Sequence, residues 1–266
     1  MTMNRIELEL KSHSIKAGMD CPYYDPNVKE SSLFYFNGSV VGFYLTELPK
    51  KINELLFIAN TELLSPRVPK SEMLRLNTDG KDEQSGKYKY KNKVSQFSTI
   101  IGSVPPKPHM KRTYPTISSV HQSKSAQPFI KAMLMIAKES EYLLKEFMPE
   151  QYVKQLEILG RTDAKWRFGN LFTSSISNFD IAAAYHRDTG NLEHTVNFIY
   201  TKRLHSTGGA LHVPDFGITV EQANNSVLVY PAWRNIHGVT PIRKSNLRGY
   251  RNSLVFYPLK AFEAFQ

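Results

Sequence analysis

The segment His186-Arg187-Asp188, together with His237 further along the chain, decides how the sequence is interpreted. Side chains two residues apart on an extended strand leave the same face, so His186 and Asp188 can bind one metal ion there. His237 follows the apolar run 227–230 and can supply a third ligand. Two imidazoles and one carboxylate on one side of an ion select non-haem Fe(II) and leave coordination positions open for oxygen chemistry.

An arginine follows in the same part of the chain. Arg251 precedes a β-like run at 253–257, and its planar guanidinium matches a carboxylate of a co-substrate. Arg248 is the alternative, but it stands beside Gly249 in a predicted loop, whereas Ser253 and the apolar run follow Arg251 directly. The sequence therefore favours Arg251 for this role.

Short motifs need support from their surroundings, since a His-x-Asp tripeptide alone arises often by chance. Five segments give that support: Phe172-Thr173, His186-Arg187-Asp188-Thr189-Gly190-Asn191, Thr195-Val196, His237-Gly238-Val239-Thr240-Pro241 and Arg251-Asn252-Ser253-Leu254-Val255-Phe256-Tyr257. Together they resemble the TET/J-binding-protein branch of the Fe(II)- and 2-oxoglutarate-dependent dioxygenases. The resemblance covers roughly residues 168–260, and its His-x-x-Thr-Pro and Arg-x-Ser-Leu-Val-Phe-Tyr segments are more specific than the metal triad.

By this resemblance His186, Asp188 and His237 bind iron, and Arg251 with Ser253 holds the distal carboxylate of 2-oxoglutarate. Fe(II) and 2-oxoglutarate are then the cofactors, and O2 is the co-substrate. The implied fold is α+β, with a double-stranded β-helix (jelly-roll) core and supporting helices, and the metal site lies inside the mouth of the roll.

The resemblance also implies a nucleobase hydroxylase that acts on the 5-methyl group of a pyrimidine in DNA. Asn191 and Tyr257 match positions that, in the TET members, hydrogen-bond to and stack on the extruded base. A base in a duplex must flip to reach such a site. Where the TET enzymes carry a base-contacting histidine shortly after that tyrosine, this chain has Leu259. The TET-like motifs favour 5-methylcytosine, and thymine, which presents the same methyl group, stays open.

Two other hypotheses come from different classes. One is a 2-oxoglutarate dioxygenase that acts on RNA, a free nucleotide or a small molecule. The other is a nucleic-acid-binding β-roll that has lost its activity, and the intact set of His186, Asp188 and His237 argues against it. A basic groove leading to the iron would favour a polymer as substrate.

The charge of the chain favours a polyanionic partner, and we expect DNA. Lysine and arginine number 34 against 24 aspartate and glutamate, which gives a net charge of +10 and an isoelectric point near 9.5. The stretch 81–124 holds nine basic residues against two acidic ones, so it carries most of the excess. We expect this stretch, and Arg243, Lys244 and Arg248 in the loop 243–248, to hold the DNA backbone.

Within the basic stretch, lysine and tyrosine alternate over residues 87–91. On a strand this pattern puts the lysines on one face and the tyrosines on the other. The lysines would either neutralise phosphates or keep an edge strand from aggregating.

Local patterns predict the elements around the site. Asn37-Gly38 between the apolar runs 33–36 and 40–45 predicts a β-hairpin. Apolar spacing predicts core-facing helices over 49–64 and 127–147, and Pro149 starts a shorter one. From Trp166 the chain is β-rich, with runs at 195–200, 211–213, 227–230 and 253–257. We expect one dioxygenase domain, 1–266, with N-terminal strands, a helix and basic loops (1–125), supporting helices (126–160) and the catalytic half of the β-roll (161–266).

Targeting and redox signals favour a soluble, intracellular protein without a membrane partner, in the cytoplasm or the nucleus. The N-terminus has charges where a signal peptide needs its apolar core, and no stretch approaches the ~20 apolar residues of a membrane span. The single cysteine, Cys21, excludes an internal disulfide and is expected to have no chemistry. His194, His205 and His212 lack partners at ligand spacing, so we expect them at the surface or behind the metal ligands.

Overall fold

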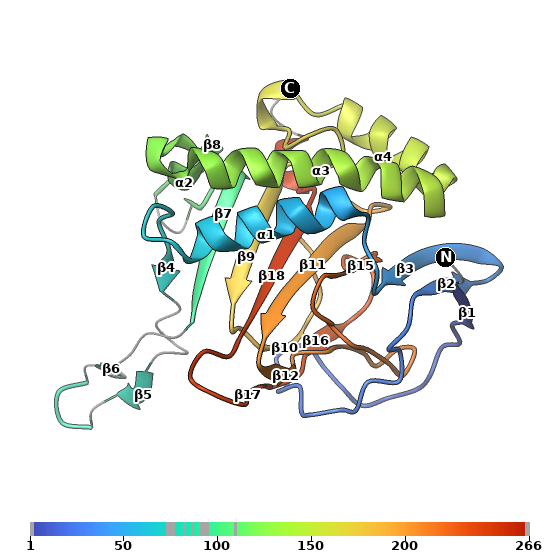
Figure 1. Cartoon of the computed structure of the whole chain (residues 1–266), viewed down its shortest axis with the longest axis horizontal. Coiled ribbons are helices and arrows are strands. Elements are labelled where there is room, and N and C mark those ends of the chain that lie inside the picture. Colours follow the sequence, from blue (N-terminus) through green and yellow to red (C-terminus); the bar gives the residue numbers. More distant parts are fainter. Residues whose placement is uncertain are drawn as a thin grey trace.

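Helices pack on one face of a large sheet, and a small sheet covers part of the other face (Figure 1). The structure is a computed structural model, and it describes residues 3–263 apart from 73–77, 82, 87, 91–95 and 109–110. The large sheet has the strand order β1 (Asn4–Glu7), β2 (Ser32–Phe36), β3 (Ser39–Leu45), β15 (Ser226–Tyr230), β11 (Asn197–Leu204), β18 (Tyr250–Tyr257), β9 (Ser174–Phe179), β7 (Phe97–Val104) and β4 (Ser71–Glu72), with β8 (Thr116–Ile117) beside β7. The small sheet has the order β10 (Ala183–His186), β16 (His237–Val239), β13 (Leu211–Val213) and β14 (Ile218–Val220). Separate strand pairs are formed by β12 (Ser206–Gly208) with β17 (Ile242–Lys244) and by β5 (Thr78–Lys81) with β6 (Tyr88–Tyr90).

The middle of the large sheet is buried on both faces. In β15, Val227 and Val229 pack toward the helices, whereas Leu228 and Tyr230 belong to the apolar cluster shared with the small sheet. Successive side chains of a strand leave opposite faces, so a strand covered on both sides needs the continuous apolar run that the sequence has here. The predicted α+β jelly-roll core with supporting helices is confirmed in this arrangement.

Two long helices lie side by side across the strands of the large sheet (Figure 1). They are α1 (Lys50–Leu64) and α3 (Gln127–Phe147), and α4 (Pro149–Gly160) follows α3. The spacing of apolar residues in α1 buries one stripe, Ile52, Leu55, Leu56, Ala59 and Leu63. The predictions of helices over 49–64 and 127–147, and of a shorter one from Pro149, are confirmed. The remaining helical pieces are short: α2 (Ser119–Gln122), η2 (Lys124–Ala126), η3 (Ala164–Trp166) and η4 (Lys260–Phe262).

The predicted N-terminal hairpin is also confirmed. β2 and β3 are joined through Asn37 and Gly38, whose φ angles of 50° and 79° are in the left-handed region that this turn requires. β3 then pairs with β15 in antiparallel register. Strands from the regions 1–125 and 161–266 therefore build one sheet, and helices from 1–125 and 126–160 cover it.

No helix among the described residues combines the length and the apolar content that a bilayer crossing requires.

Packing of α1 on the sheet can be tested with a pair of leucines on the same helix. Leu56 is fully buried against the sheet, whereas Leu64 is exposed. We expect Leu56→Ala to lower the free energy of unfolding by about 2–5 kcal/mol, because it removes apolar contacts and leaves a cavity. Leu64→Ala, the control, should change it by less than about 0.5 kcal/mol. Urea unfolding followed by circular dichroism measures both; equal effects of the two substitutions would contradict this packing.

Candidate active site

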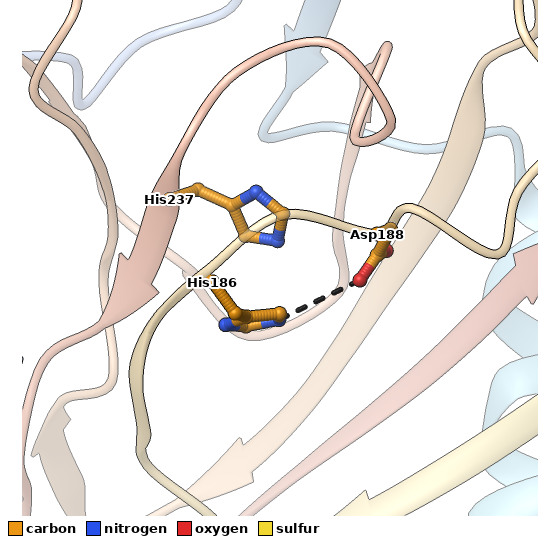
Figure 2. A group of neighbouring side chains, drawn as sticks. All are labelled: His186, Asp188 and His237. Carbon is orange, nitrogen blue, oxygen red and sulfur yellow. Dashed lines mark ion pairs between the residues drawn. The ribbon is translucent and has the colours of Figure 1, made fainter. Parts of the chain in front are cut away.

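Three side chains, from two paired strands and the loop after one of them, point toward one another (Figure 2). His186 ends β10 and His237 begins β16, and the antiparallel pairing of these strands puts the two residues opposite each other. Their ring centroids lie 4.4 Å apart, and His186 Nε2 lies 3.6 Å from Asp188 Oδ1. Ligand atoms of the three residues all lie within 4.8 Å of one another, so the set can hold one metal ion.

Asp188 does not lie on a strand, which corrects the expectation that 186 and 188 share one extended segment. β10 ends at His186, and the chain turns, with the Asn191 N–H donating to Asp188 O over 3.0 Å. The Asp188 N–H donates to Ala232 O over 3.2 Å, which ties this turn to the segment before His237. The turn, and not strand periodicity, therefore brings the carboxylate to the two histidines.

Backbone carbonyls orient the two imidazoles. Nδ1 of His186 lies 2.8 Å from Ala184 O, and Nδ1 of His237 lies 3.1 Å from Asn235 O. Since a carbonyl oxygen only accepts, each Nδ1 carries the hydrogen, and each Nε2 keeps its lone pair for a metal. Burial, and then the neighbouring His186, lowers the pKa of His237 to about 3. This ring is therefore neutral at physiological pH and loses no proton when it binds a metal.

Two buried amides hold one oxygen of the Asp188 carboxylate. Nδ2 of Asn197 donates to Asp188 Oδ2 over 3.2 Å and Nδ2 of Asn191 over 3.4 Å. Burial raises the pKa of Asp188, while His186 and the two amides lower it. Because Oδ2 is engaged, Oδ1, which faces His186, is the oxygen that remains for a metal.

The triad lines a cavity of about 240 Å³ inside the roll, together with a row of residues from β18. Arg251, Ser253, Val255 and Tyr257 alternate along this strand, so their side chains leave the same face. Tyr257 is close enough to Asp188 for that carboxylate, after burial, to raise the pKa of the tyrosine. The cavity thus extends along β18 from the triad toward Arg251.

Arg251 is a buried cation with free hydrogen-bonding capacity. Its side chain is 2% exposed, and its Nε has no hydrogen-bond partner among the described residues. Burial and then Arg203 lower the pKa of Arg251 to about 10, which leaves it charged at neutral pH. Arg248, the alternative from the sequence, is exposed on the surface and does not line the cavity. A buried guanidinium with an unpaired N–H is suited to bind a carboxylate.

The predicted base-contacting residues both line the cavity. Tyr257 does so beside Asp188. Asn191 does so while its Nδ2 donates to Asp188 and, over 3.0 Å, to Asn197 Oδ1. Leu259 is not among the residues that line the cavity; its backbone bridges to Asn191, and its N–H donates to the Thr173 hydroxyl.

The basic segment 243–248, expected to be a loop, is a strand in its first part. Residues 242–244 form β17, paired with β12, instead of a loop. Lys244 makes an ion pair with Asp180, and the Arg243 guanidinium lies 4.7 Å from the centre of the Tyr23 ring. Both cations therefore already have partners inside the chain. In the stretch 81–124, Tyr88–Tyr90 is a strand, the case for which the Lys-Tyr alternation was considered, whereas Lys87 and Lys91 lie outside the described residues.

His194, His205, His212 and Cys21 are not members of the triad, although His212 lies opposite Gly238, the neighbour of His237, on the paired strands β13 and β16. His194 and His205 are exposed, while His212 is buried, stacks on Tyr24 at 4.0 Å and bonds to Thr219. Cys21 is buried and free, and burial raises its pKa, which makes the thiol less reactive at neutral pH.

Comparison with known proteins identifies the family. The model of the oxygenase domain of the 2OGFeDO superfamily, Tet/JBP, matches residues 105–260, more than half of the chain. The chain belongs to the Tet/JBP oxygenase family. It is therefore an Fe(II)- and 2-oxoglutarate-dependent dioxygenase, as the sequence predicted.

One solved structure shares the fold of this Tet/JBP oxygenase, and others match it with lower scores. NgTET1, in a complex with 5mC DNA, has a TM-score of 0.61 at 15% identity, covering 98% of this chain and 84% of that one. A full-length protein of Neurospora crassa, in complex with alpha-KG, has a TM-score of 0.43 at 13% identity, covering 82% and 75%. A 2OG-Fe(II) oxygenase family protein from Burkholderia pseudomallei has a TM-score of 0.41 at 16% identity, covering 80% and 82%. No curated protein matches the chain.

Among the residues that line the cavity of this oxygenase, Asn197, Gln222 and Tyr230 were not predicted as site residues from the sequence. Asn197 supports Asp188, Gln222 lines the cavity together with Arg251, and Tyr230 packs edge-on against His237, with ring centroids 5.4 Å apart. Asn197 directly follows Thr195-Val196, one of the family-like segments, so its position was the one available signal. Gln222 lies in a connection without a pattern of its own.

Support of Asp188 by Asn197 can be tested by metal binding. We expect Asn197→Ala to weaken the binding of Mn(II) about 10- to 100-fold, because the carboxylate loses a donor that fixes its orientation. Isothermal titration calorimetry measures the dissociation constant. Asn170→Ala is the control, since its amide donates to Glu141 at the surface, away from the cavity. An unchanged Mn(II) affinity in Asn197→Ala would contradict this role.

Proposed function

We propose that this oxygenase hydroxylates the 5-methyl group of a pyrimidine base in DNA, with 5-methylcytosine favoured over thymine. One observation carries the proposal: a His-Asp-His set and a buried arginine with an unpaired N–H line the same cavity. The first has the ligand types that suit Fe(II), and the second suits a carboxylate.

In this proposal His186, Asp188 and His237 hold the iron, with Nε2 of each imidazole and Oδ1 of the carboxylate as ligand atoms. Arg251 and Ser253 hold the distal carboxylate of 2-oxoglutarate. When bound, Fe(II), 2-oxoglutarate and O2 together supply an oxidant able to hydroxylate an unactivated methyl group. His237, being neutral, loses no proton when it binds the metal, and the two amides already hold Asp188 Oδ2.

DNA as substrate is supported by charge and by the fold. The net charge of +10 favours a polyanion, and the similar structure NgTET1 is in a complex with 5mC DNA. A base inside a duplex cannot reach a cavity within a β-roll, so the base must flip out. Tyr257 then offers an aromatic face for stacking on the flipped base.

The hydrogen-bonding state of Asn191 supports 5-methylcytosine over thymine. Its Nδ2 donates to Asp188 and to Asn197, which uses both hydrogens of the amide. The carboxamide oxygen remains as an acceptor. An acceptor pairs with the exocyclic amino group of cytosine, whereas thymine presents another acceptor, O4, at the same edge.

Arg251 is tested against Arg248, the arginine outside the cavity. We expect Arg251→Lys to weaken the binding of 2-oxoglutarate about 10- to 100-fold, because an ammonium cannot replace the planar fork of donors. Arg248→Lys should bind 2-oxoglutarate with the same dissociation constant as the unaltered protein. Calorimetric titration of the Mn(II)-loaded protein gives both constants; a larger loss in Arg248→Lys would reverse the assignment.

The substrate is tested by mass spectrometry of nucleosides. The protein is incubated with Fe(II), 2-oxoglutarate and O2 on duplexes that contain either 5-methylcytosine or only thymine, with His186→Ala and Asp188→Ala as controls. We expect a gain of one oxygen on 5-methylcytosine that both variants lose. An oxidised thymine would reverse the preference between the bases. Succinate without any oxidised base would exclude DNA and direct the search to RNA, nucleotides or small molecules.

A further inference from the structure

Gln222 is a buried amide beside the anion-binding part of the cavity. It follows β14 in the chain, is 1% exposed and lines the same cavity as Arg251 and Ser253. Its backbone oxygen accepts from Arg203 Nη1 over 2.9 Å, which fixes the main chain at this point. The residue is thus held in place from outside the cavity while its side chain faces inward.

The Gln222 carboxamide has one end bonded and one end free. Thr201 Oγ1 donates to Gln222 Oε1 over 2.9 Å, whereas Gln222 Nε2 is buried without a partner among the described residues. A buried donor left unpaired is costly, so few occur without a reason. Because the oxygen is turned to Thr201, the two N–H groups are those available to a ligand in the cavity.

The charges around Arg251 leave room for an anion. Arg203 and Arg251 lie opposite each other on the paired strands β11 and β18. Lys244 forms an ion pair with Asp180, and Glu221 is the acidic neighbour of Arg203. This described part of the roll thus has three cationic side chains (Arg203, Arg251 and Lys244) and two carboxylates (Asp180 and Glu221). One bound carboxylate balances the charge.

We propose that Gln222 is a third donor to the distal carboxylate of 2-oxoglutarate, beside Arg251 and Ser253, and that it makes the enzyme selective for a dicarboxylate. The inference rests on the proposed function of this cavity. A carboxylate has about four lone-pair sites, so it can accept from a guanidinium, a hydroxyl and an amide together. A 2-oxo acid without the distal carboxylate leaves all three donors unpaired and binds poorly.

The test is calorimetric titration of the Mn(II)-loaded full chain with 2-oxoglutarate. Gln222→Met keeps the length of the side chain without its donors, and Gln222→Glu replaces them with a negative charge. We expect the dissociation constant to rise about tenfold or more in Gln222→Met and about a hundredfold or more in Gln222→Glu. Thr201→Val, which frees the carboxamide to turn, should show a smaller rise than Gln222→Met.

Two controls separate this role from a structural one. Gln151→Met removes an amide that donates to His194 O on the surface and should leave 2-oxoglutarate binding unchanged. Mn(II) affinity should be the same in all variants. With 2-oxopentanoate, which ends in a methyl group, Gln222→Met and the unaltered protein should bind equally weakly.

Results that would overturn the role of Gln222 can be distinguished from results that would overturn the proposed function. Equal 2-oxoglutarate affinity in Gln222→Met and the unaltered protein would overturn the role of Gln222 and leave the proposed function standing. A loss of Mn(II) affinity in Gln222→Met would also overturn it, because the substitution would then act on the metal site. Failure of the unaltered protein itself to bind 2-oxoglutarate would overturn both proposals.

Discussion

The antiparallel pairing of β10 with β16 is the constraint on which the active site depends. It sets His186 opposite His237, although 50 residues lie between them in the sequence, and a backbone carbonyl accepts from Nδ1 of each ring. A small sheet of short strands would not by itself hold the two histidines rigidly. Burial against the large sheet, which is covered by helices on its other face, makes the support rigid.

The cavity unites two chemically different environments. Around the triad, burial keeps His237 neutral, and burial raises the pKa of Asp188 while two buried amides hold its Oδ2. Around Arg251, cations outnumber carboxylates and donors lack acceptors. A molecule with a chelating oxo acid at one end and a carboxylate at the other satisfies both environments at once, because each end meets the groups that it needs.

Sequence patterns were informative where the deciding interactions are local. The helices α1 and α3 and the hairpin β2–β3 agree with the prediction because apolar spacing and the Asn37-Gly38 turn act within a few residues. Asp188 was placed on a strand, since nothing local shows that β10 ends at His186. The sequence likewise did not show that Lys244, expected to hold the DNA backbone, forms an ion pair with Asp180 from a separate strand connection. Polar residues in connections have no periodicity, so their roles become visible only when their distant partners are known.

The pairing of β3 with β15 also bears on how the chain folds during synthesis. Leu45 lies opposite Val227, so the N-terminal hairpin leaves the ribosome long before its neighbour in the sheet exists. Until then one edge of the hairpin has unpaired N–H and C=O groups and an apolar face without cover. Contacts of such sequence separation slow folding and leave an aggregation-prone edge exposed until the second half of the chain has been made.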